Sequence, residues 1–580
     1  MRAVRNLFSY TKPYRIFVLL APLLMALEVT MDLLQPMFMQ TIIDDGIANG
    51  ELSYVIEMGI YMLLAAIVGL VGGIGCTVYS TKAAVNVASD IRNDLFNKAL
   101  HFSSENRDAI GIGKMITIIT SDVALIQHAL MMTLRVFVRG PLLFIGSIII
   151  VFFQARELFP IIIVTIPILL LCITYFSKKA GKWFKKVQEG LDMLNTKLQQ
   201  SIAGIRVIKA FVRKDYEIQT FKKINDHLTN RTIAADKLMT FLMPILLFII
   251  NIGIIVALLL GVIPIGQNEV QIGVILAFIN YLNIILMALM SSSTVLMQLM
   301  RAFPSAERVQ NLLETKPRIR KELQNESIKL IEGDLEFRDV CFAYEENGEN
   351  VLEHLSFTVN KGEKVGIIGP TGSGKTTLIK LFPRLYDPTH GEILLNGRNI
   401  KEYHLDEYRS LFGYISQKAS LFSGSIASNL KFGRTNTTNE QLHLATVHAC
   451  ASEFIEKFDD KLEHPLTQGA TNLSGGQKQR LSIARALVRN PSILILDDVT
   501  SAVDAHSESS ILNTLQTVYK EKTQIIVASK ISSIKHADKI LVIDDGMIVG
   551  EGTHEQLLDI CPLYQEIYAT QTDKGGVAVE

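Results

Sequence analysis

The sequence predicts a chain of two domains, a six-helix all-α transmembrane domain followed by an α/β P-loop nucleotide-binding domain. Three observations predict this fold class. Apolar residues crowd the part of the chain before about Met300. Strands and helices alternate from Leu335 onward, which is typical of a largely parallel sheet. Residues 369–377 read Gly-Pro-Thr-Gly-Ser-Gly-Lys-Thr-Thr, which matches the phosphate-binding pattern G-x-x-x-x-G-K-[ST].

Composition narrows the class of protein further. The chain has 580 residues with 57 Lys and Arg and 57 Asp and Glu, so its formal net charge is zero. No overall basic charge points to nucleic acid as a partner. The mean hydropathy of +0.28 is high for a soluble enzyme. The five cysteines form no C-x-x-C pair, which indicates free thiols rather than a disulfide framework.

The first half of the chain is organised around apolar spans. Residues 1–15 are polar and basic with apolar side chains interleaved, which predicts an amphipathic elbow helix on the cytoplasmic interface, with an unstructured tail as the alternative. No cleavable signal peptide is expected. Six spans follow, each long enough to cross a hydrocarbon core of about 30 Å, at about 16–43, 54–82, 135–154, 158–177, 239–263 and 271–298.

The connections between these spans alternate in length. Those after spans one, three and five are short. Those after spans two and four are long and basic, and span four is followed directly by Lys178, Lys179, Lys182, Lys185 and Lys186. The positive-inside rule then places both termini and both long connections in the cytoplasm. Helical periodicity predicts two cytoplasmic arms, each with a short transverse element at its tip, near 101–108 and near 211–217.

Charged side chains inside a span are costly unless they face a partner or a wet cavity. Glu28 and Asp32 lie four residues apart on one face of span one, and Arg135 and Arg139 do the same at the start of span three. One interpretation is a substrate surface for cationic cargo that includes Glu28, Asp32 and Arg139. The other is a structural acid–arginine pair between the helices, or snorkelling of Arg135. The sequence leaves both open.

The predicted boundaries are 1–315 for the transmembrane domain, 316–332 for a charged linker and 333–580 for the nucleotide-binding domain. Within the last, Lys364–Ile368 is predicted as a short buried strand and residues 376–382 as the following helix. The glycines between them let backbone N–H groups turn around a triphosphate, and the helix N-terminus adds its positive dipole end. Lys375 would reach the β- and γ-phosphates, and Thr376 would hold Mg²⁺.

The predicted phosphate site therefore includes nine consecutive residues: Gly369, Pro370, Thr371, Gly372, Ser373, Gly374, Lys375, Thr376 and Thr377. A glycine-rich turn without a ligand is the alternative. Tyr344 follows a predicted strand, and its ring could stack on an adenine ring, with a half-buried strand residue as the alternative. The apolar run Ile493–Asp497 predicts a buried parallel strand that presents Asp497 at its carboxyl end, where the carboxylate can hold Mg²⁺ through water.

Downstream of the P-loop stands a signature segment, Leu473, Ser474, Gly475, Gly476 and Gln477. With it the sequence resembles, over nearly its whole length, the ATP-binding cassette (ABC) transporters, and among them the bacterial multidrug exporter halves. The resemblance implies an ATPase that uses ATP and Mg²⁺. It implies that Tyr344 stacks on adenine and that Gln417 touches Mg²⁺ and reports to the membrane domain.

The same resemblance implies contacts between two subunits. Ser474, Gly475 and Gly476 would clamp the γ-phosphate of ATP bound on the opposite subunit. Residues 501–504, which end in Asp504, would form the D-loop that crosses the dimer interface. The transverse elements near 101–108 and 211–217 would be coupling helices.

Two catalytic positions depart from the family pattern. The residue after the Mg²⁺ aspartate is normally Glu, and here it is Asp498, whose carboxylate is drawn back by about 1 Å, a misplacement that can cost around a hundredfold in rate. The family's γ-phosphate histidine is replaced by Ser529. A milder departure is Gln468, where these exporters usually have Glu. The catalytic set is therefore Asp498, Asp497, Gln417 and Ser529.

Because the binding residues persist while the hydrolysis residues are weakened, the sequence predicts a heterodimer with a second, different ABC half-transporter. This chain's P-loop would serve a degenerate site, and its signature segment would complete a competent one. A homodimer is the alternative. The expected activity is ATP-driven efflux of small hydrophobic or cationic drugs through the bilayer of the bacterial plasma membrane. The rivals are a lipid or peptide exporter and a membrane-anchored ATP sensor that moves nothing.

Overall fold

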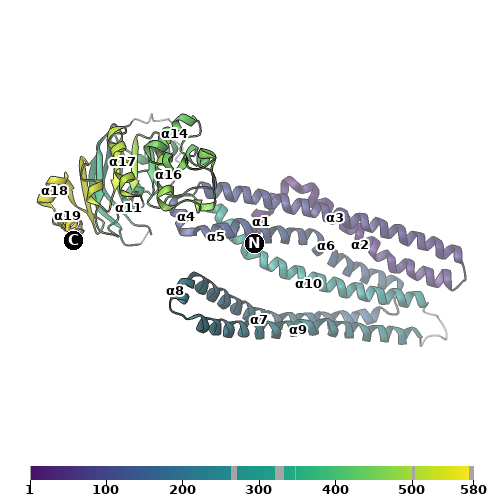
Figure 1. The fold of residues 1–580 in the computed structure, drawn as a ribbon. Helices are drawn as coiled ribbons and strands as arrows, with labels where there is room; N and C mark the ends of the chain where they lie inside the picture. Colours follow the sequence, from purple (N-terminus) through teal and green to yellow (C-terminus); the bar gives the residue numbers. More distant parts are fainter. Residues whose placement is uncertain (1, 263–270, 320–331, 346–347, 500–502, 574–580) are drawn as a thin grey trace. The chain divides into compact units, whose positions relative to one another are not determined.

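The computed structural model describes residues 2–262, 271–319, 332–345, 348–499 and 503–573 (Figure 1). The chain divides into two compact units. The first contains residues 1–100 and 113–315, and the second contains residues 101–112 and 316–580. The short segment 101–112 therefore belongs by its contacts to the second unit, although both of its neighbours in the sequence belong to the first.

The first unit is entirely helical. Its helices are α1 (Arg2–Phe8), α2 (Arg15–Thr41), α3 (Leu52–Leu100), α5 (Ile112–Thr117), α6 (Val123–Gln154), α7 (Phe159–Ala203), α8 (Ile205–Ala210), α9 (Lys214–Val262) and α10 (Ile272–Glu314). In the described part of the chain, six helical segments are long and apolar enough to cross a membrane: Arg5–Ile47, Leu52–Leu100, Ile112–Gln154, Phe159–Ala203, Lys214–Leu260 and Ile272–Ser292. The predicted six-helix transmembrane fold is confirmed. The loop predicted after span five lies mostly outside the described residues.

Small residues on α3 bring it close to α2. A Cβ atom on Gly72 would lie 2.9 Å from the carbonyl oxygen of Leu24 and 3.1 Å from the amide of Glu28. Cys76 and Ala83 on the same face of α3 are fully buried. This close contact between α2 and α3 fixes the position of Glu28 relative to the neighbouring helices. All five cysteines are free thiols.

The segment that precedes α6 is fastened to the end of α10 by one buried carboxylate. Asp122 closes the π-helical stretch Ile118–Asp122, and its side chain is 3% exposed. It accepts hydrogen bonds from Ser305 Oγ at 2.9 Å and from Arg308 Nε at 2.7 Å and Nη2 at 2.5 Å. π-Helical stretches often mark functional positions in helices, so this cluster joins the segment before α6 to the end of α10 at an irregular point.

Replacing Asp122 by Asn is expected to lower the free energy of unfolding by about 1–3 kcal/mol, because Arg308 loses the charged acceptor that the buried Asp122 carboxylate provides. Asp226→Asn, an exposed aspartate of α9, should stay within about 0.5 kcal/mol of the parent. Thermal unfolding of both variants in detergent measures the difference. Equal shifts for the two variants would contradict this account of the cluster.

The two short helices at the tips of the arms differ slightly from the predicted breaks. Helix α4 (Ser104–Ile110) overlaps 101–108. Helix α8 lies just before 211–217, since α7 ends at Ala203 and the chain turns at residues 211–213, where Val212 has a φ of +54°. In Figure 1, α7 and α9 run side by side with α8 at their shared end. Phe211 and Val212 at this tip are 74% and 86% exposed.

The second unit contains two main sheets. Their strands, together with the short β7–β8 pair, are β1 (Leu335–Phe342), β2 (Leu352–Val359), β3 (Lys364–Ile368), β4 (His390–Leu395), β5 (Arg398–Asn399), β6 (Phe412–Ile415), β7 (Gly424–Ser425), β8 (Pro465–Leu466), β9 (Ile493–Asp497), β10 (Thr523–Val527), β11 (Lys539–Asp544) and β12 (Met547–Gly552). The larger sheet has the order β12-β11-β3-β10-β9-β6 and is parallel except for β12. This arrangement confirms the predicted α/β fold.

The smaller sheet, β2-β1-β4-β5, is antiparallel and was not predicted. Irregular pairing explains why, since β1 shifts register between Phe337 and Val340 and the apolar–polar alternation breaks there. The helices of this unit are α4, α11 (Lys375–Leu381), α12 (Leu405–Ser410), α13 (Ile426–Lys431), α14 (Asn439–His448), α15 (Ser452–Ile455), α16 (Gly475–Val488), α17 (Ala505–Thr517), α18 (His554–Ile560) and α19 (Pro562–Asp573).

Strands β3, β9 and β10 are buried along their whole length. This is expected where a parallel sheet is covered on both faces. One apolar cluster includes residues of α16 and α17, and the other includes the antiparallel sheet and α11. The P-loop follows β3 at the edge formed by the carboxyl ends of the parallel strands.

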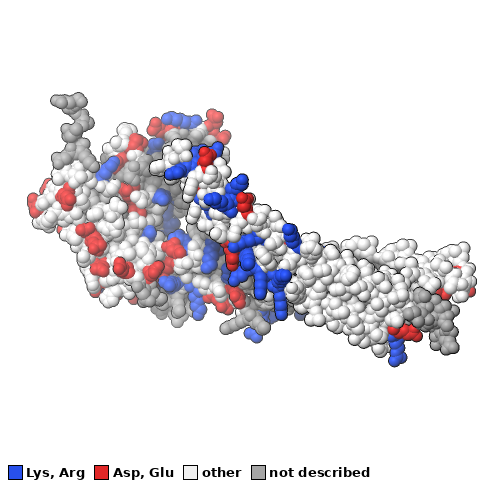
Figure 2. Space-filling view, turned by 90° about the horizontal axis from the view of Figure 1, so that it is seen from below, with Lys and Arg blue, Asp and Glu red and all other residues white. Residues whose placement is uncertain are grey.

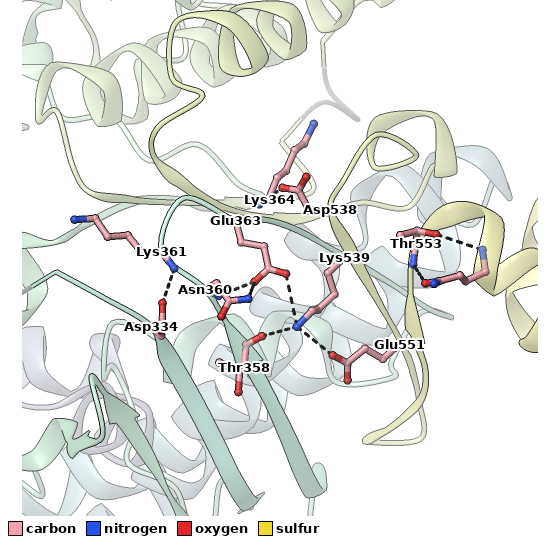
Figure 3. Close-up of polar contacts among 11 residues, drawn as sticks. Asp334, Thr358, Asn360, Lys361, Glu363, Lys364, Asp538, Lys539, Glu551 and Thr553 are labelled. Atoms are coloured by element: carbon pink, nitrogen blue, oxygen red, sulfur yellow. Dashed lines mark hydrogen bonds and ion pairs between the residues drawn. The ribbon is translucent and has the colours of Figure 1, made fainter.

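A polar cluster ties the two sheets together at the opposite edge (Figure 3). Lys539 on β11 lies 3.6 Å from Glu363 and 3.2 Å from Glu551 on β12, and it donates to the carbonyl oxygen of Thr358 on β2 at 2.8 Å. The Lys364 amide donates to Asp538 at 2.9 Å. These contacts fix the amino ends of the strands. The P-loop lies at the opposite, carboxyl ends of the parallel strands, which are therefore held in place as well.

Candidate nucleotide site and membrane cavity

The P-loop connects β3 to α11, and its backbone passes close to neighbouring segments at two glycines. A Cβ atom on Gly369 would collide with the carbonyl oxygen of Ile543, and one on Gly374 would lie 2.7 Å from Leu352. Gly374 also has a φ of +99° and is the N-cap residue of α11. Ser373 and Thr377 are buried, whereas Pro370, Thr371 and Gly372 are exposed at the tip of the loop. Glycine is therefore required at positions 369 and 374 for this backbone path.

Lys375 bends back over its own loop. Its Nζ donates to the carbonyl oxygens of Gly369 at 2.8 Å and Pro370 at 2.5 Å. Burial lowers the pKa of Lys375, and the negative charges of Asp498 and Asp497 oppose that shift. An ammonium group at this point can exchange carbonyl oxygens for phosphate oxygens.

Two oxygen ligands of the kind Mg²⁺ prefers meet at the carboxyl end of β9. Asp497 is 2% exposed, and its Oδ1 accepts a hydrogen bond from Thr376 Oγ1 at 3.2 Å. Thr376 comes from the first turn of α11, so the loop and the strand converge on one point. This donor set fits a magnesium ion that is held beside the phosphates.

Binding of Mg²⁺ at this point is expected to depend on pH through Asp497. Burial raises the pKa of Asp497, and the negative charge of Asp498 raises it further. A proton therefore competes for this carboxylate at higher pH than at an ordinary aspartate. Mg²⁺-dependent nucleotide binding should weaken as pH falls through that raised pKa and recover as pH rises.

A fluorescent ATP analogue titrated with and without Mg²⁺, from mildly acidic to neutral pH, measures this dependence. Asp497→Asn is the control that removes the titrating group and leaves the pH dependence of the nucleotide itself. Identical pH profiles for the parent and this variant would show that Asp497 does not carry the effect.

Tyr344 is held by its hydroxyl group. The hydroxyl lies 3.0 Å from Thr377 Oγ1 on α11, and the residue is 39% exposed. Lys380 Nζ lies 5.7 Å from the ring centroid. The tyrosine is thus fixed to α11 and remains partly exposed. Lys380, which lies beside it, was not predicted from the sequence as part of the site.

Asp498 is the centre of a small hydrogen-bonded group. Its carboxylate accepts from Ser529 Oγ at 3.0 Å and from Gln417 Nε2 at 3.3 Å. Its backbone has a φ of +45°, a region that Asp adopts more readily than most residues. The three predicted residues therefore come together from the segments after β9, β10 and β6, and Ser529 contacts the carboxylate directly.

The signature segment begins the 14-residue helix α16. Ser474 is the N-cap, with its Oγ accepting from the Gln477 amide at 3.3 Å, while the Gln477 side chain accepts from the Ser474 amide at 2.9 Å. Ser474 and Gly475 are exposed, and a Cβ atom on Gly475 would meet nothing within 4 Å. Leu473 is buried and anchors the segment. The cap thus presents an open helix N-terminus at the surface.

Asp504 serves as the N-cap of α17, since it accepts from the Ser507 amide at 2.9 Å. Residues 501 and 502 of the predicted D-loop lie outside the described residues. Gln468 is exposed in a short 3₁₀ turn before the signature segment.

Two sets of contacts were missed by sequence reasoning. Gln479 of α16, which is 1% exposed, donates to the carbonyl oxygen of Ser416 at 3.2 Å and so ties the signature helix to the loop that carries Gln417. On α4, Asn106 donates to the carbonyl oxygen of Lys316 at 3.2 Å, and Asp108 accepts from the Tyr386 hydroxyl. A glutamine on the apolar face of α16 was the available signal for the first set.

The charged residues of spans one and three form a cluster. Arg139 on α6 lies 3.3 Å from Glu28 and 2.9 Å from Asp32 on α2. A cavity of about 640 Å³ lies beside it, lined among others by Glu28, Asp32, Gln35, Thr77 and Arg135. The structural pair that the sequence left open is therefore formed by Arg139, and the pair borders a cavity that Arg135 also lines.

Comparisons with known proteins give a consistent result. Residues 18–289 match the model of the ABC transporter transmembrane region, and residues 352–501 match that of the ABC transporter. The Bacillus subtilis protein YfiB, named as an uncharacterized ABC transporter ATP-binding protein, is 35% identical over 573 residues, or 99% of each chain. The Mycobacterium tuberculosis protein Rv1273c, named in the same way, is 32% identical over 577 residues, 98% of this chain and 99% of its own.

A solved structure of a bacterial Atm1-family ABC exporter with ATP bound shares the fold. Its TM-score is 0.80 at 23% sequence identity, and the match covers 98% of this chain and 99% of that one. The six helices and the α/β unit described above thus occur together in a single chain of that exporter.

Proposed function

The chain belongs to the ABC transporter family, with a membrane region and an ATP-binding domain on one polypeptide, and we propose that it is the degenerate half of a heterodimeric drug exporter. As a member of this family it is an ATPase coupled to transport. In the proposal, ATP binding by two different chains closes the nucleotide domains, and hydrolysis at one of the two sites resets them.

The observation that carries the proposal is the pairing of Asp498 with Ser529. The shortened carboxylate is tied to the Ser529 hydroxyl at 3.0 Å. Serine at this position carries no imidazole to reach a γ-phosphate. A carboxylate that is displaced by about 1 Å orients an attacking water poorly, at a cost near a hundredfold. The phosphate-binding and Mg²⁺ ligands keep the family pattern, so this site is expected to hold ATP and turn it over slowly.

The signature segment supports the second half of the proposal. Its capping box is complete, and Ser474 and Gly475 are exposed at an open helix N-terminus. Such a terminus suits the terminal phosphate of a nucleotide on another chain. We infer that it completes the competent site, whose glutamate and histidine belong to the partner.

The tip of the α7–α9 arm supports assembly with a second chain. Phe211 and Val212 beside α8 are largely exposed, and apolar groups exposed at a tip favour a protein surface as their cover. We infer that α4 and α8 act as coupling helices. We also infer that the chain lies in a bacterial plasma membrane with both termini in the cytoplasm.

The membrane cavity favours small amphipathic cargo. The side chains of Asp32 and Arg139 remain 40% and 42% exposed within the single chain, and charges at this depth are retained beside wet cavities or partners rather than lipid. Glu28, Asp32 and Arg135 are the charged residues among a mostly apolar lining, and we infer that hydrophobic or cationic drugs are the substrates.

ATP-dependent accumulation of a hydrophobic cationic dye in inverted vesicles tests the function. Vesicles that contain this chain with its partner half should accumulate the dye, and a Ser474→Arg variant should not. Accumulation of lipid or peptide instead would identify another kind of exporter. Absence of any cargo movement despite ATP turnover would favour a sensor or regulator and overturn the proposal.

A further inference from the structure

The part of α7 that follows its apolar stretch carries a dense group of lysines. We define the α7 basic patch as Lys178, Lys179, Lys182, Lys185 and Lys186, all of which are exposed. No acidic residue occurs between Glu157 and Glu189. None of the five lysines forms an ion pair with another residue that the structure describes. Five like charges therefore stand close together without acidic partners on their own helix.

The helix packed against this segment does not neutralise it. Arg231 of α9 donates to the carbonyl oxygen of Lys186 at 2.9 Å and lies 3.9 Å from Glu189. The next turns of α9 bring Asp236 and Lys237, whose charges cancel. Figure 2 views the molecule from the side on which α7 and α9 lie in Figure 1, and shows Lys and Arg gathered beside a stretch almost free of charged residues.

The position of the patch matches the headgroup layer of a membrane. The apolar stretch of α7 ends at about residue 177. At 1.5 Å per residue, residues 178–186 cover about 12 Å of helix directly beyond it. The headgroup layers extend about 5–8 Å beyond each side of the hydrocarbon core, and lysine side chains extend along the interface to reach it.

Aromatic side chains accompany the lysines. Lys179 Nζ lies 5.8 Å from the ring centroid of Tyr175, and Lys186 Nζ lies 4.6 Å from that of Trp183. Tyr and Trp are enriched at the membrane–water interface. Trp183 is the only tryptophan of the chain, so its fluorescence reports on the patch alone.

We propose that the α7 basic patch binds the headgroups of anionic phospholipids in the cytoplasmic leaflet, and that these lipids anchor the α7–α9 arm. The proposal rests on the membrane crossing of α7 and on the proposed topology. Each lysine near an anionic surface strengthens attachment on the order of fivefold. The patch is thus an interaction surface for lipid, separate from the cargo cavity and from the nucleotide site.

Quenching of Trp183 by spin-labelled lipids tests the proposal on the full chain in nanodiscs. Two nanodisc samples are compared, both made mainly of unlabelled phosphatidylcholine. One contains a minor share of nitroxide-labelled phosphatidylglycerol, and the other contains the same share of nitroxide-labelled phosphatidylcholine. In both labelled lipids the nitroxide lies near the headgroup end of one acyl chain. The labelled phosphatidylglycerol is expected to quench Trp183 several-fold more than the labelled phosphatidylcholine, and high salt should reduce the difference. A Trp183→Phe chain gives the background.

Charge variants assign the effect to the patch. Changing its five lysines to Gln should abolish the preference for phosphatidylglycerol, and changing them to Arg should keep it. The matched control changes Lys209, Arg213, Lys214, Lys222 and Lys223 to Gln, all exposed residues. The last of these lies eight residues before Arg231, about 12 Å farther along α9. This control should keep the preference.

Equal quenching by the two labelled lipids in the unmodified chain would overturn the proposal, and this result needs no variant to fold. A preference that survives the lysine-to-glutamine changes would also overturn it. Because the measurement uses neither ATP nor cargo, its outcome is independent of the heterodimer and drug-export proposals.

Discussion

Replacing Ser474 by Arg in this chain is expected to abolish ATP turnover by the assembled transporter. The loss should be at least about a hundredfold, the size of effect seen when one preorganised hydrogen-bond donor is removed from a catalytic site. Ser474 and Gly475 form an exposed helix N-terminus whose orientation the Ser474–Gln477 capping box fixes. A bulky cation there removes the cap and blocks the approach of a nucleotide bound to the partner.

Thr438→Arg is a closely matched control. Thr438 caps α14 through the same kind of capping box, with Gln441, and it is also exposed. Its replacement should cost about 1 kcal/mol of stability through the lost cap and leave ATP turnover unchanged. Normal turnover in the Ser474→Arg transporter, or equal losses in both variants, would mean that this chain's signature segment does not complete the active site.

Restoring both catalytic positions is expected to convert the slow site into a faster one. Asp498→Glu with Ser529→His should raise turnover at this chain's own P-loop site by about ten- to a hundredfold, because the carboxylate advances by about 1 Å and an imidazole replaces the hydroxyl now bonded to Asp498. The single substitutions should gain much less, since residues that act as a unit are not additive.

This gain is measured in a complex whose partner carries Gln in place of its catalytic Glu, so that only the repaired site turns over. Asp498→Asn in the same background should change the already slow rate by less than about tenfold. If the double substitution leaves the rate unchanged, Asp498 and Ser529 are not what limits hydrolysis at this site.

Much of the fold followed from short-range patterns in the sequence. The apolar spans predicted the six helices because crossing a membrane demands long apolar stretches. The strands around the P-loop were predicted with their bounds, since β3 and β9 are buried throughout and read as continuous apolar runs. The antiparallel sheet was missed because the bulge after Phe337 interrupts the alternation that marks such strands.

Contacts between distant segments could not be predicted in the same way. Whether Glu28 and Asp32 meet cargo or an arginine depends on how closely α2, α3 and α6 approach one another, and the approach of α3 to α2 depends on the absence of side chains at Gly72 and Gly73. The sequence identified the charges and their shared helix face. The packing of the helices decides that Arg139, rather than Arg135, is their partner, and this packing could not be predicted from the sequence.

The same limit applies at the nucleotide site. The motif identified Asp498 and Ser529 as departures from the family pattern, but the hydrogen bond between them depends on the neighbouring positions of β9 and β10 in the sheet. The role of Gln479 was not predicted, because no sequence motif marks it. Its contact with the loop after β6 is seen only in the folded structure.

The most direct test of the asymmetric-site proposal is the ATPase activity of this chain purified alone, compared with the same chain purified together with its partner half. The account predicts little turnover by the chain alone, brisk turnover by the pair, and loss of that turnover when the partner's catalytic Glu is replaced by Gln. Brisk, drug-stimulated turnover by the chain alone would contradict it, and would show that Asp498 suffices in a homodimer.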